Sequence, residues 1–136
     1  MVVDAQGGGL GKQLITAMKR DFPDVHILAV GTNSAATSAM LKAGADEAAT
    51  GENAARVASR RAGIIIGPIG MVIADAMLGE ITPMIACTIA QADAQRIMIP
   101  FSNCDNYIAG VSDFSTGKLI ADALKQLKMC LNSDDE

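Results

Sequence analysis

The sequence predicts a single three-layer α/β domain, in which helices flank a mostly parallel sheet of five or six strands. Three observations lead to this prediction. The length of 136 residues fits one domain. Half of the residues are apolar and 19% are charged, which suits a chain with one hydrophobic core. Short β-branched runs alternate with longer segments of helical periodicity, and this alternation is typical of a parallel sheet covered by helices.

The first half of the chain contains three strand–helix pairs. Val2 and Val3 open a short strand, and Phe22-Pro23 ends the helix that follows it. Asn33 is the expected N-cap of the second helix, and Gly44 stands at its C-terminal end. Strands are expected at 2–3, 25–30 and 46–50, and helices at 10–21, 34–42 and 52–61.

The second half continues the same alternation. The run 63–66 is typical of a strand buried on both faces, and Thr82-Pro83 is a strong helix start. Strands are expected at 63–66, 96–100 and 107–111, and helices at 69–78, 82–92 and 115–131. Six strands fit a Rossmann-like sheet in the order 3-2-1-4-5-6. If 46–50 is only a loop, five strands in flavodoxin-like order are the alternative. The domain should span 1–131, followed by a frayed acidic tail at 132–136.

Composition excludes several classes of protein. A net charge of −4 and 3% aromatic residues argue against nucleic-acid binding. The three cysteines are widely spaced and the chain has one histidine, so we expect neither a metal site nor a disulfide framework. The longest uncharged runs, 62–74 and 81–92, are shorter than the roughly 18 residues of a membrane helix. We expect a cytoplasmic protein without a membrane partner.

The most informative segment lies between the first strand and the first helix, where Gly7, Gly8, Gly9, Gly11 and Lys12 occur together. Glycines let a backbone turn tightly and approach a ligand, and the amides of a helix N-terminus favour phosphate. The spacing is neither G-x-G-x-x-G nor a Walker A loop. Two interpretations are open, a phosphate-binding loop or a tight turn with close packing. Four glycines in five positions exceed what a turn needs, so we favour the first.

Two further loops should face this one. Thr32 and Asn33 follow the second strand, and they are either helix-capping residues or contacts to a ribose or phosphate. A typical NAD site has an Asp or Glu at this place, and this loop has none. Gly67, Pro68 and Gly70 follow the fourth strand and reach the same edge of the sheet. They either form the floor of a ligand site or let two backbones meet.

Candidate catalytic groups at this edge are Cys104 and Asp4. A cysteine nucleophile needs a base, and His26 lies at the opposite edge of the sheet. Asp4 either bonds the amides of the glycine loop or holds a metal ion with Asp75 or Asp105. We favour the bonding role for Asp4 and an inert thiol for Cys104.

Two resemblances support the fold. The segment 40–47 is similar to the nucleotide-binding regulatory domains of potassium transporters and to other Rossmann domains, which implies the fold alone. Over nearly its full length the chain resembles an uncharacterised bacterial family of unknown function. The segments that carry this likeness are 4–12, 31–33, 36–47, 50–54, 67–70 and 77–83. The family brings no known activity.

We therefore expect a module that binds or senses a nucleotide or dinucleotide, with NAD(P) or an adenine nucleotide as its ligand. Phosphates would lie on the glycine loop, with Thr32 and Asn33 at the ribose. One alternative is a small oxidoreductase or transferase with its substrate near 102–105. Another is an interaction subunit without a ligand. A homodimer fits the apolar composition.

Overall fold

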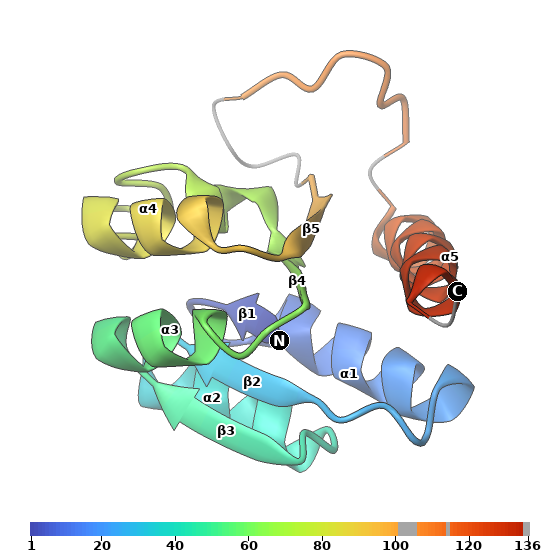
Figure 1. The fold of residues 1–136 in the computed structure, drawn as a ribbon. Helices are drawn as coiled ribbons and strands as arrows, with labels where there is room; N and C mark the ends of the chain where they lie inside the picture. Colours follow the sequence, from blue (N-terminus) through green and yellow to red (C-terminus); the bar gives the residue numbers. More distant parts are fainter. Residues whose placement is uncertain (101–105, 114, 135–136) are drawn as a thin grey trace.

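β-Branched and alanine-rich runs form the five strands of one parallel sheet (Figure 1). The computed structural model describes residues 1–100, 106–113 and 115–134. The strands are β1 (Val2–Asp4), β2 (Leu28–Gly31), β3 (Glu47–Thr50), β4 (Ile64–Pro68) and β5 (Gln95–Ile99). Their order across the sheet is β3-β2-β1-β4-β5, and every neighbouring pair is parallel.

The short strand β1 lies at the centre of this sheet. Val3 is opposite Val30 of β2, and Val2 is opposite Ile66 of β4. The chain builds outward from β1 first through β2 and β3, and then in the other direction through β4 and β5. The predicted Rossmann-like order is confirmed for these five strands, and the flavodoxin-like alternative is wrong. The order reverses between β1 and β4, where open α/β sheets place their ligands.

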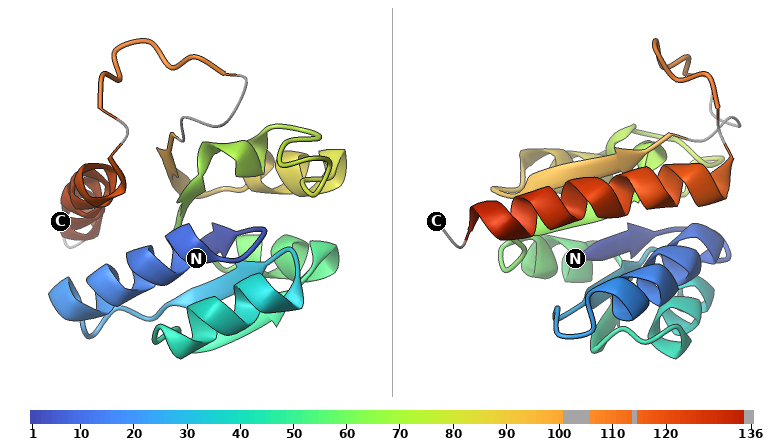
Figure 2. Two further views of the ribbon diagram at one scale, coloured as in Figure 1. Left: turned by 180° about the vertical axis from the view of Figure 1, so that it is seen from behind. Right: turned by 90° about the vertical axis from the view of Figure 1, so that its right-hand side faces the viewer.

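In the described part of the chain, five α-helices cover the two faces of the sheet (Figures 1 and 2). The core on one face joins the sheet to α1 (Gly9–Asp21), α2 (Ser34–Lys42) and α5 (Thr116–Ser133). The core on the other face joins it to α3 (Glu52–Ser59) and α4 (Pro83–Gln91). Val2 belongs to the first core and Val3 to the second, because successive strand residues point to opposite faces.

The predicted helix starts agree with the structure where a capping side chain marks them. The Oδ1 atom of Asn33 accepts a hydrogen bond from the Ala36 amide at 2.9 Å and so caps α2. The Oγ1 atom of Thr82 accepts one from the Ile85 amide at 3.1 Å, and Pro83 follows as the first residue of α4. Both loops that bear these caps lie near the carboxyl edge of the sheet.

The predicted helix over 69–78 is wrong. Only Ile69–Val72 form a helical turn, of the 3₁₀ type. The chain then runs through a series of tight turns, with positive φ angles at Asp75, Met77 and Leu78. The apolar residues that suggested a helix still serve the core, since Met71 is buried and Val72 and Met77 are partly buried against the same core.

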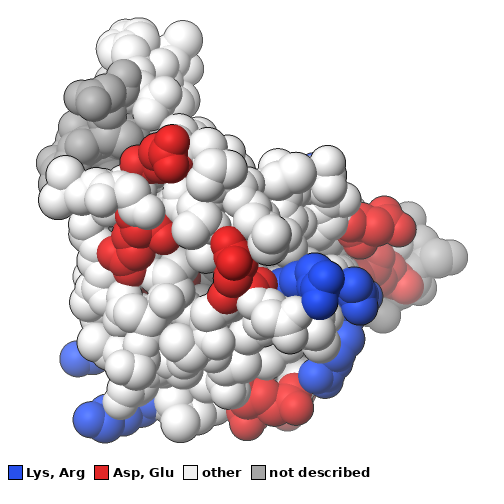
Figure 3. Space-filling view, turned by 90° about the vertical axis from the view of Figure 1, so that its left-hand side faces the viewer, with Lys and Arg blue, Asp and Glu red and all other residues white. Residues whose placement is uncertain are grey.

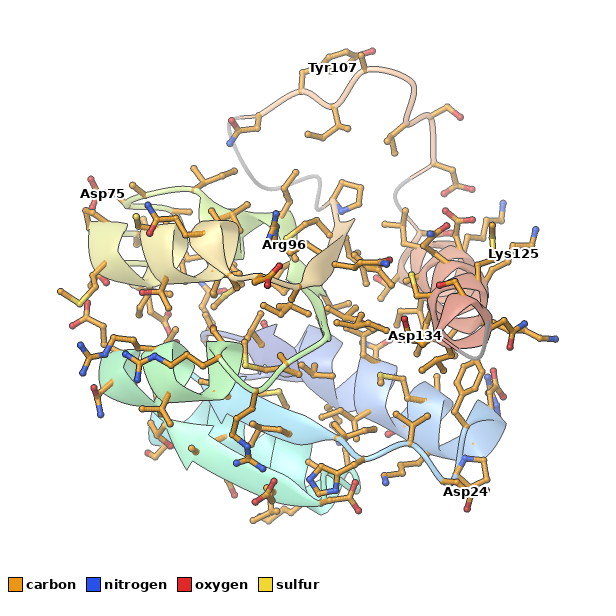
Figure 4. The ribbon with its side chains drawn as sticks, viewed as in Figure 1. Asp24, Asp75, Arg96, Tyr107, Lys125 and Asp134 are labelled. Carbon is orange, nitrogen blue, oxygen red and sulfur yellow. The ribbon has the colours of Figure 1, made fainter. Side chains whose placement is uncertain are left out.

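The predicted strand at 107–111 is also wrong. Gly110 has a φ angle of 87°, and the Val111 amide donates to the carbonyl of Ile108 at 3.3 Å, so the segment forms a turn. Tyr107 is 87% exposed and lies away from the body of the protein (Figure 4). Among the residues that the structure describes, β5 is therefore the edge strand on this side of the sheet. In the part of the chain described, no helix combines the length and apolar character needed to cross a membrane.

Candidate functional site

A pocket of about 710 Å³ lies at the carboxyl ends of β1 and β4, where the strand order reverses. We call it the crest pocket. Its walls are the glycine loop and the segment that follows β4. The residues that line it are 4–10, Pro68, Gly70, 73–78 and Asn106. Its volume falls within the range of roughly 300–1,000 Å³ that is usual for small-molecule sites.

The glycines of the loop divide into two kinds. A Cβ atom at Gly8 would lie 2.8 Å from the Cα atom of Ala36, and one at Gly11 would lie 2.6 Å from the sulfur of Met40. These two glycines let α1 approach α2 closely. A Cβ atom at Gly7 or Gly9 would meet nothing within 4 Å. Gly7 and Gly9 border the crest pocket, and their lack of side chains keeps it open.

The backbone amides of the loop also fall into two groups, according to whether they donate a hydrogen bond to another described residue. The Gly8 amide donates to the carbonyl of Ala5 at 3.0 Å, and the Gly11 amide donates to Oδ2 of Asp4 at 2.7 Å. Among the described residues, none accepts a hydrogen bond from the amides of Gly7 and Gly9. These two donors stand at the N-terminus of a 13-residue helix, whose dipole favours an anion.

Asp4 is 5% exposed and accepts hydrogen bonds from the loop with both carboxyl oxygens. Besides the bond from Gly11, Oδ1 accepts from the Ala5 amide at 2.8 Å. Burial raises the pKa of Asp4 against the lowering effect of these amides, and the nearby charge of Glu80 raises it further. Asp4 thus holds the turn between β1 and α1, as we favoured from the sequence.

Thr32 and Asn33 contact an acidic side chain that sequence reasoning missed. Oε1 of Glu80 accepts hydrogen bonds from Oγ1 of Thr32 at 2.5 Å, from Nδ2 of Asn33 at 2.7 Å and from the Gln6 amide at 2.8 Å. Nδ2 of Asn33 also donates to the carbonyl of Gln6 at 2.9 Å. Burial raises the pKa of Glu80, but the three hydrogen bonds outweigh it, so the net shift is downward and the carboxylate stays ionised.

Glu80 supplies the acid that the loop after β2 lacks. It is 48 residues from Thr32 in the sequence, so no local motif could have placed it there. The sequence carries one related signal, which is that the loop after β2 has no Asp or Glu of its own. The helix that we predicted over 69–78 also obscured the position of Glu80, because a helix there would have led the chain away from β2.

Basic side chains do not line the crest pocket in the described part of the chain. Lys12 lies outside it, at a separate pocket of about 930 Å³ between α1 and α5. Figure 3 shows the side toward which β2 and β3 point in Figure 1. Acidic groups lie at the upper left and centre of that face, with further acidic groups at its right and bottom, and Lys and Arg lie at its lower left and right. Figure 4 places Asp75 on this same side of the molecule.

The glycines after β4 have different surroundings. A Cβ atom at Gly67 would lie 2.5 Å from the carbonyl oxygen of Val3, so this glycine lets β4 lie close to β1. Pro68 and Gly70 line the crest pocket. A Cβ atom at Gly70 would meet only the flexible end of Met77, at 2.9 Å.

All four non-glycine residues with positive φ in the described chain line the crest pocket: Gln6, Asp75, Met77 and Leu78. Such conformations cost of order 1–3 kcal/mol each, and they cluster at functional sites. Their concentration here agrees with a functional role for this edge of the sheet.

The candidate nucleophile Cys104 and the segment 102–105 lie outside the described residues. Within 1–100, 106–113 and 115–134, no cluster of His, Cys, Asp and Glu is arranged to hold a metal ion. The polar side chains that line the crest pocket are Asp4, Gln6, Asp75 and Asn106.

Comparison with protein families gave one result. The family model described as "Domain of unknown function (DUF3842)" matches residues 1–132. It confirms the resemblance to an uncharacterised family over nearly the full chain. Neither the curated proteins nor the solved structures gave a match.

Proposed function

The chain belongs to the DUF3842 family, whose function is unknown, and we propose that it binds a nucleotide or dinucleotide in the crest pocket as a binding or sensing module. The observation that carries the proposal is the pocket itself. It lies where the strand order reverses, and one of its walls is a glycine loop with two amides that bond to none of the described residues.

The phosphate groups of the ligand would contact the amides of Gly7 and Gly9. Both amides stand at the start of α1, so they combine hydrogen bonding with the positive end of the helix dipole. A Cβ at either position would project into open space, where the phosphate would lie. This arrangement needs no lysine, which agrees with the position of Lys12 outside the pocket.

The base and sugar would lie against the opposite wall. Ile73, Ala76, Met77 and Leu78 give that wall an apolar surface, which suits the face of a base. Asp75 and Asn106 add polar groups at its rim. NAD(P), ADP and ATP combine a diphosphate with a base in this way, and NAD(P) or an adenine nucleotide is the ligand that we propose.

A binding or sensing role agrees with the state of Asp4, the candidate acid in the pocket. Both of its oxygens are engaged by the loop amides, so it acts as a structural tie. We propose no reaction for this site.

A comparison of two glycine variants tests the proposal. Gly9→Val places a branched side chain in the open space of the crest pocket. Gly63→Val is the matched control, because it places the same side chain in open space at the opposite edge of the sheet. Thermal unfolding would be followed with NAD, NADP, ATP, ADP and AMP. A ligand at a hundred times its Kd stabilises by about 2.7 kcal/mol, which moves the midpoint by several degrees.

We expect a ligand-dependent shift for wild type and Gly63→Val, and none for Gly9→Val. Circular dichroism of all three proteins controls for folding. A shift of equal size in Gly9→Val would place the ligand elsewhere. The absence of any shift in wild type would refute nucleotide binding.

A further inference from the structure

We infer that Gln6, Thr32 and Asn33 form an anion cradle, which takes a phosphate or carboxylate group of the ligand, and that Glu80 is a built-in competitor for it. The cradle consists of three donors: the Gln6 amide, the Thr32 hydroxyl and the side-chain amide of Asn33. The inference rests on the proposed function, because it concerns the same site.

The geometry of the three donors supports the cradle. They come from two different loops, after β1 and after β2, and they converge on one oxygen atom at 2.5–2.8 Å. Convergent donors of this kind recognise carboxylates and phosphates alike. Gln6 borders the crest pocket, so the cradle adjoins the place where the phosphates of a nucleotide would lie. Glu80 acts as the anion in this structure.

Glu80 belongs to a compact loop over residues 73–82, which we call the crest loop. The Asp75 amide donates to the carbonyl of Ile81 at 2.8 Å, and the Ile81 amide donates to that of Ala76 at 3.2 Å. Thr82 donates to Oε1 of Glu52 at 2.6 Å at the base of the loop. The loop is therefore closed on itself and anchored at one end, and Glu80 ties it to the glycine loop.

Two features of the structure oppose the contact between Glu80 and the three donors of the cradle. Glu80 lies close enough to the buried Asp4 for the two carboxylates to repel each other. The residues just before Glu80 include Asp75, Met77 and Leu78, all with positive φ. Release of Glu80 would remove the repulsion and let these residues relax.

A ligand anion and Glu80 cannot use the three donors at once. Binding of the anion therefore requires release of Glu80, and release frees the crest loop from the glycine loop. In this way the crest loop would report whether the pocket is occupied, as a sensing module requires. Only molecules in which Glu80 has left the cradle can bind the ligand. The apparent affinity for the ligand therefore falls in proportion to their fraction.

The experiment removes the competitor and measures affinity. Glu80→Ala is compared with wild type and with Asp75→Asn, which removes an acid from the same pocket and leaves the cradle untouched. ADP, NADP and inorganic pyrophosphate are the probes, in calorimetric titrations. If nine in ten molecules hold the tie, Glu80→Ala binds about tenfold more tightly. The double variant Glu80→Ala/Thr32→Val should lose most of this gain, because it lacks one cradle donor.

Hydrogen exchange of residues 75–81 gives a second readout. We expect faster exchange in Glu80→Ala alone, and in wild type when a probe is bound. Weaker binding to Glu80→Ala would show that the carboxylate contacts the ligand directly, and it would overturn the competitor role. Equal affinity would overturn it as well, while leaving nucleotide binding intact. If no probe binds either protein, both the cradle and the proposed function are wrong.

Discussion

Adjacent glycines in the loop after β1 should respond in opposite ways to the same substitution. At Gly8, alanine must adopt a φ angle of 73°, a left-handed conformation that costs roughly 1–2 kcal/mol outside glycine. Its Cβ would also lie 2.8 Å and 2.9 Å from backbone atoms of Ala36, so α2 must move. Overpacking of this kind typically costs about 1–3 kcal/mol. We therefore expect Gly8→Ala to lower the free energy of unfolding by about 2–5 kcal/mol.

At Gly9 the new methyl group meets nothing within 4 Å, and the residue is already helical. Alanine is favoured over glycine in a helix by roughly 0.5–1 kcal/mol, so Gly9→Ala should leave stability unchanged or raise it. Urea unfolding monitored by circular dichroism measures both values. Equal destabilisation by the two variants would show that the whole loop is packed. The division of the glycines into packing and pocket positions would then be wrong.

Three further predictions concern polar groups elsewhere in the fold. Thr82→Ala removes the cap of α4 and a partner of Glu52, and should cost about 1 kcal/mol in urea unfolding; an unchanged midpoint would show that the cap is dispensable. Asp4 has its pKa raised above the ordinary 3.8, chiefly by burial, so its charged form opposes folding. Wild type should therefore gain stability relative to Asp4→Asn as the pH falls from 7 through the folded-state pKa of Asp4, and a loss of stability relative to Asp4→Asn over that range would contradict this sign. The pKa of Asp46 is lowered, first by its hydrogen bond from Lys19 and then by the Ile27 amide. Asp46→Asn should thus be less stable than wild type at pH 7, and equilibrium unfolding should show that deficit vanish as the pH falls through the folded-state pKa.

Local signals in the sequence predict most of the fold because capping residues, glycines and prolines stand where helices and strands begin or end. The second helix was predicted over 34–42 as observed, since Asn33 caps its start and Gly44, with a φ angle of 118°, ends it. Four of the five strands were predicted from short runs rich in Val and Ile between helical segments, whereas the alanine-rich strand at 46–50 had a loop as its alternative. The reversal of strand order then follows from topology, and with it the position of the pocket.

The helix over 69–78 and the strand over 107–111 were predicted wrongly because tertiary contacts and backbone geometry determine the conformation of these segments. The apolar run after β4 has the composition of a helix, but Glu80 draws it across the edge of the sheet to the loops after β1 and β2. The strand expected at 107–111 has β-branched residues, but Gly110 adopts a left-handed conformation within a turn. The partners of Glu80 lie 47–74 residues away in the sequence, so no local pattern marks this contact.

The structure brings the predicted glycine loop to the crest pocket, but the sequence did not predict the acidic partner of the loops. Gly7 and Gly9 border the pocket, and Asp4 bonds the loop amides. Lys12 follows Gly11 directly, yet the helical rotation carries it toward α5. The polar contact that joins the two loops comes from Glu80, which only the folded chain brings to Thr32.

The most direct test of nucleotide binding at the glycine loop is a ¹⁵N-correlated NMR titration of the wild-type protein with ADP and with NAD. The account predicts that the amide signals of Gly7 and Gly9 shift most, because their protons would bond the phosphates. Signals of the crest loop should shift with them, while those of Gly63 at the opposite edge stay in place. Shifts confined to other surfaces, or a spectrum unchanged at millimolar ligand, would contradict the account.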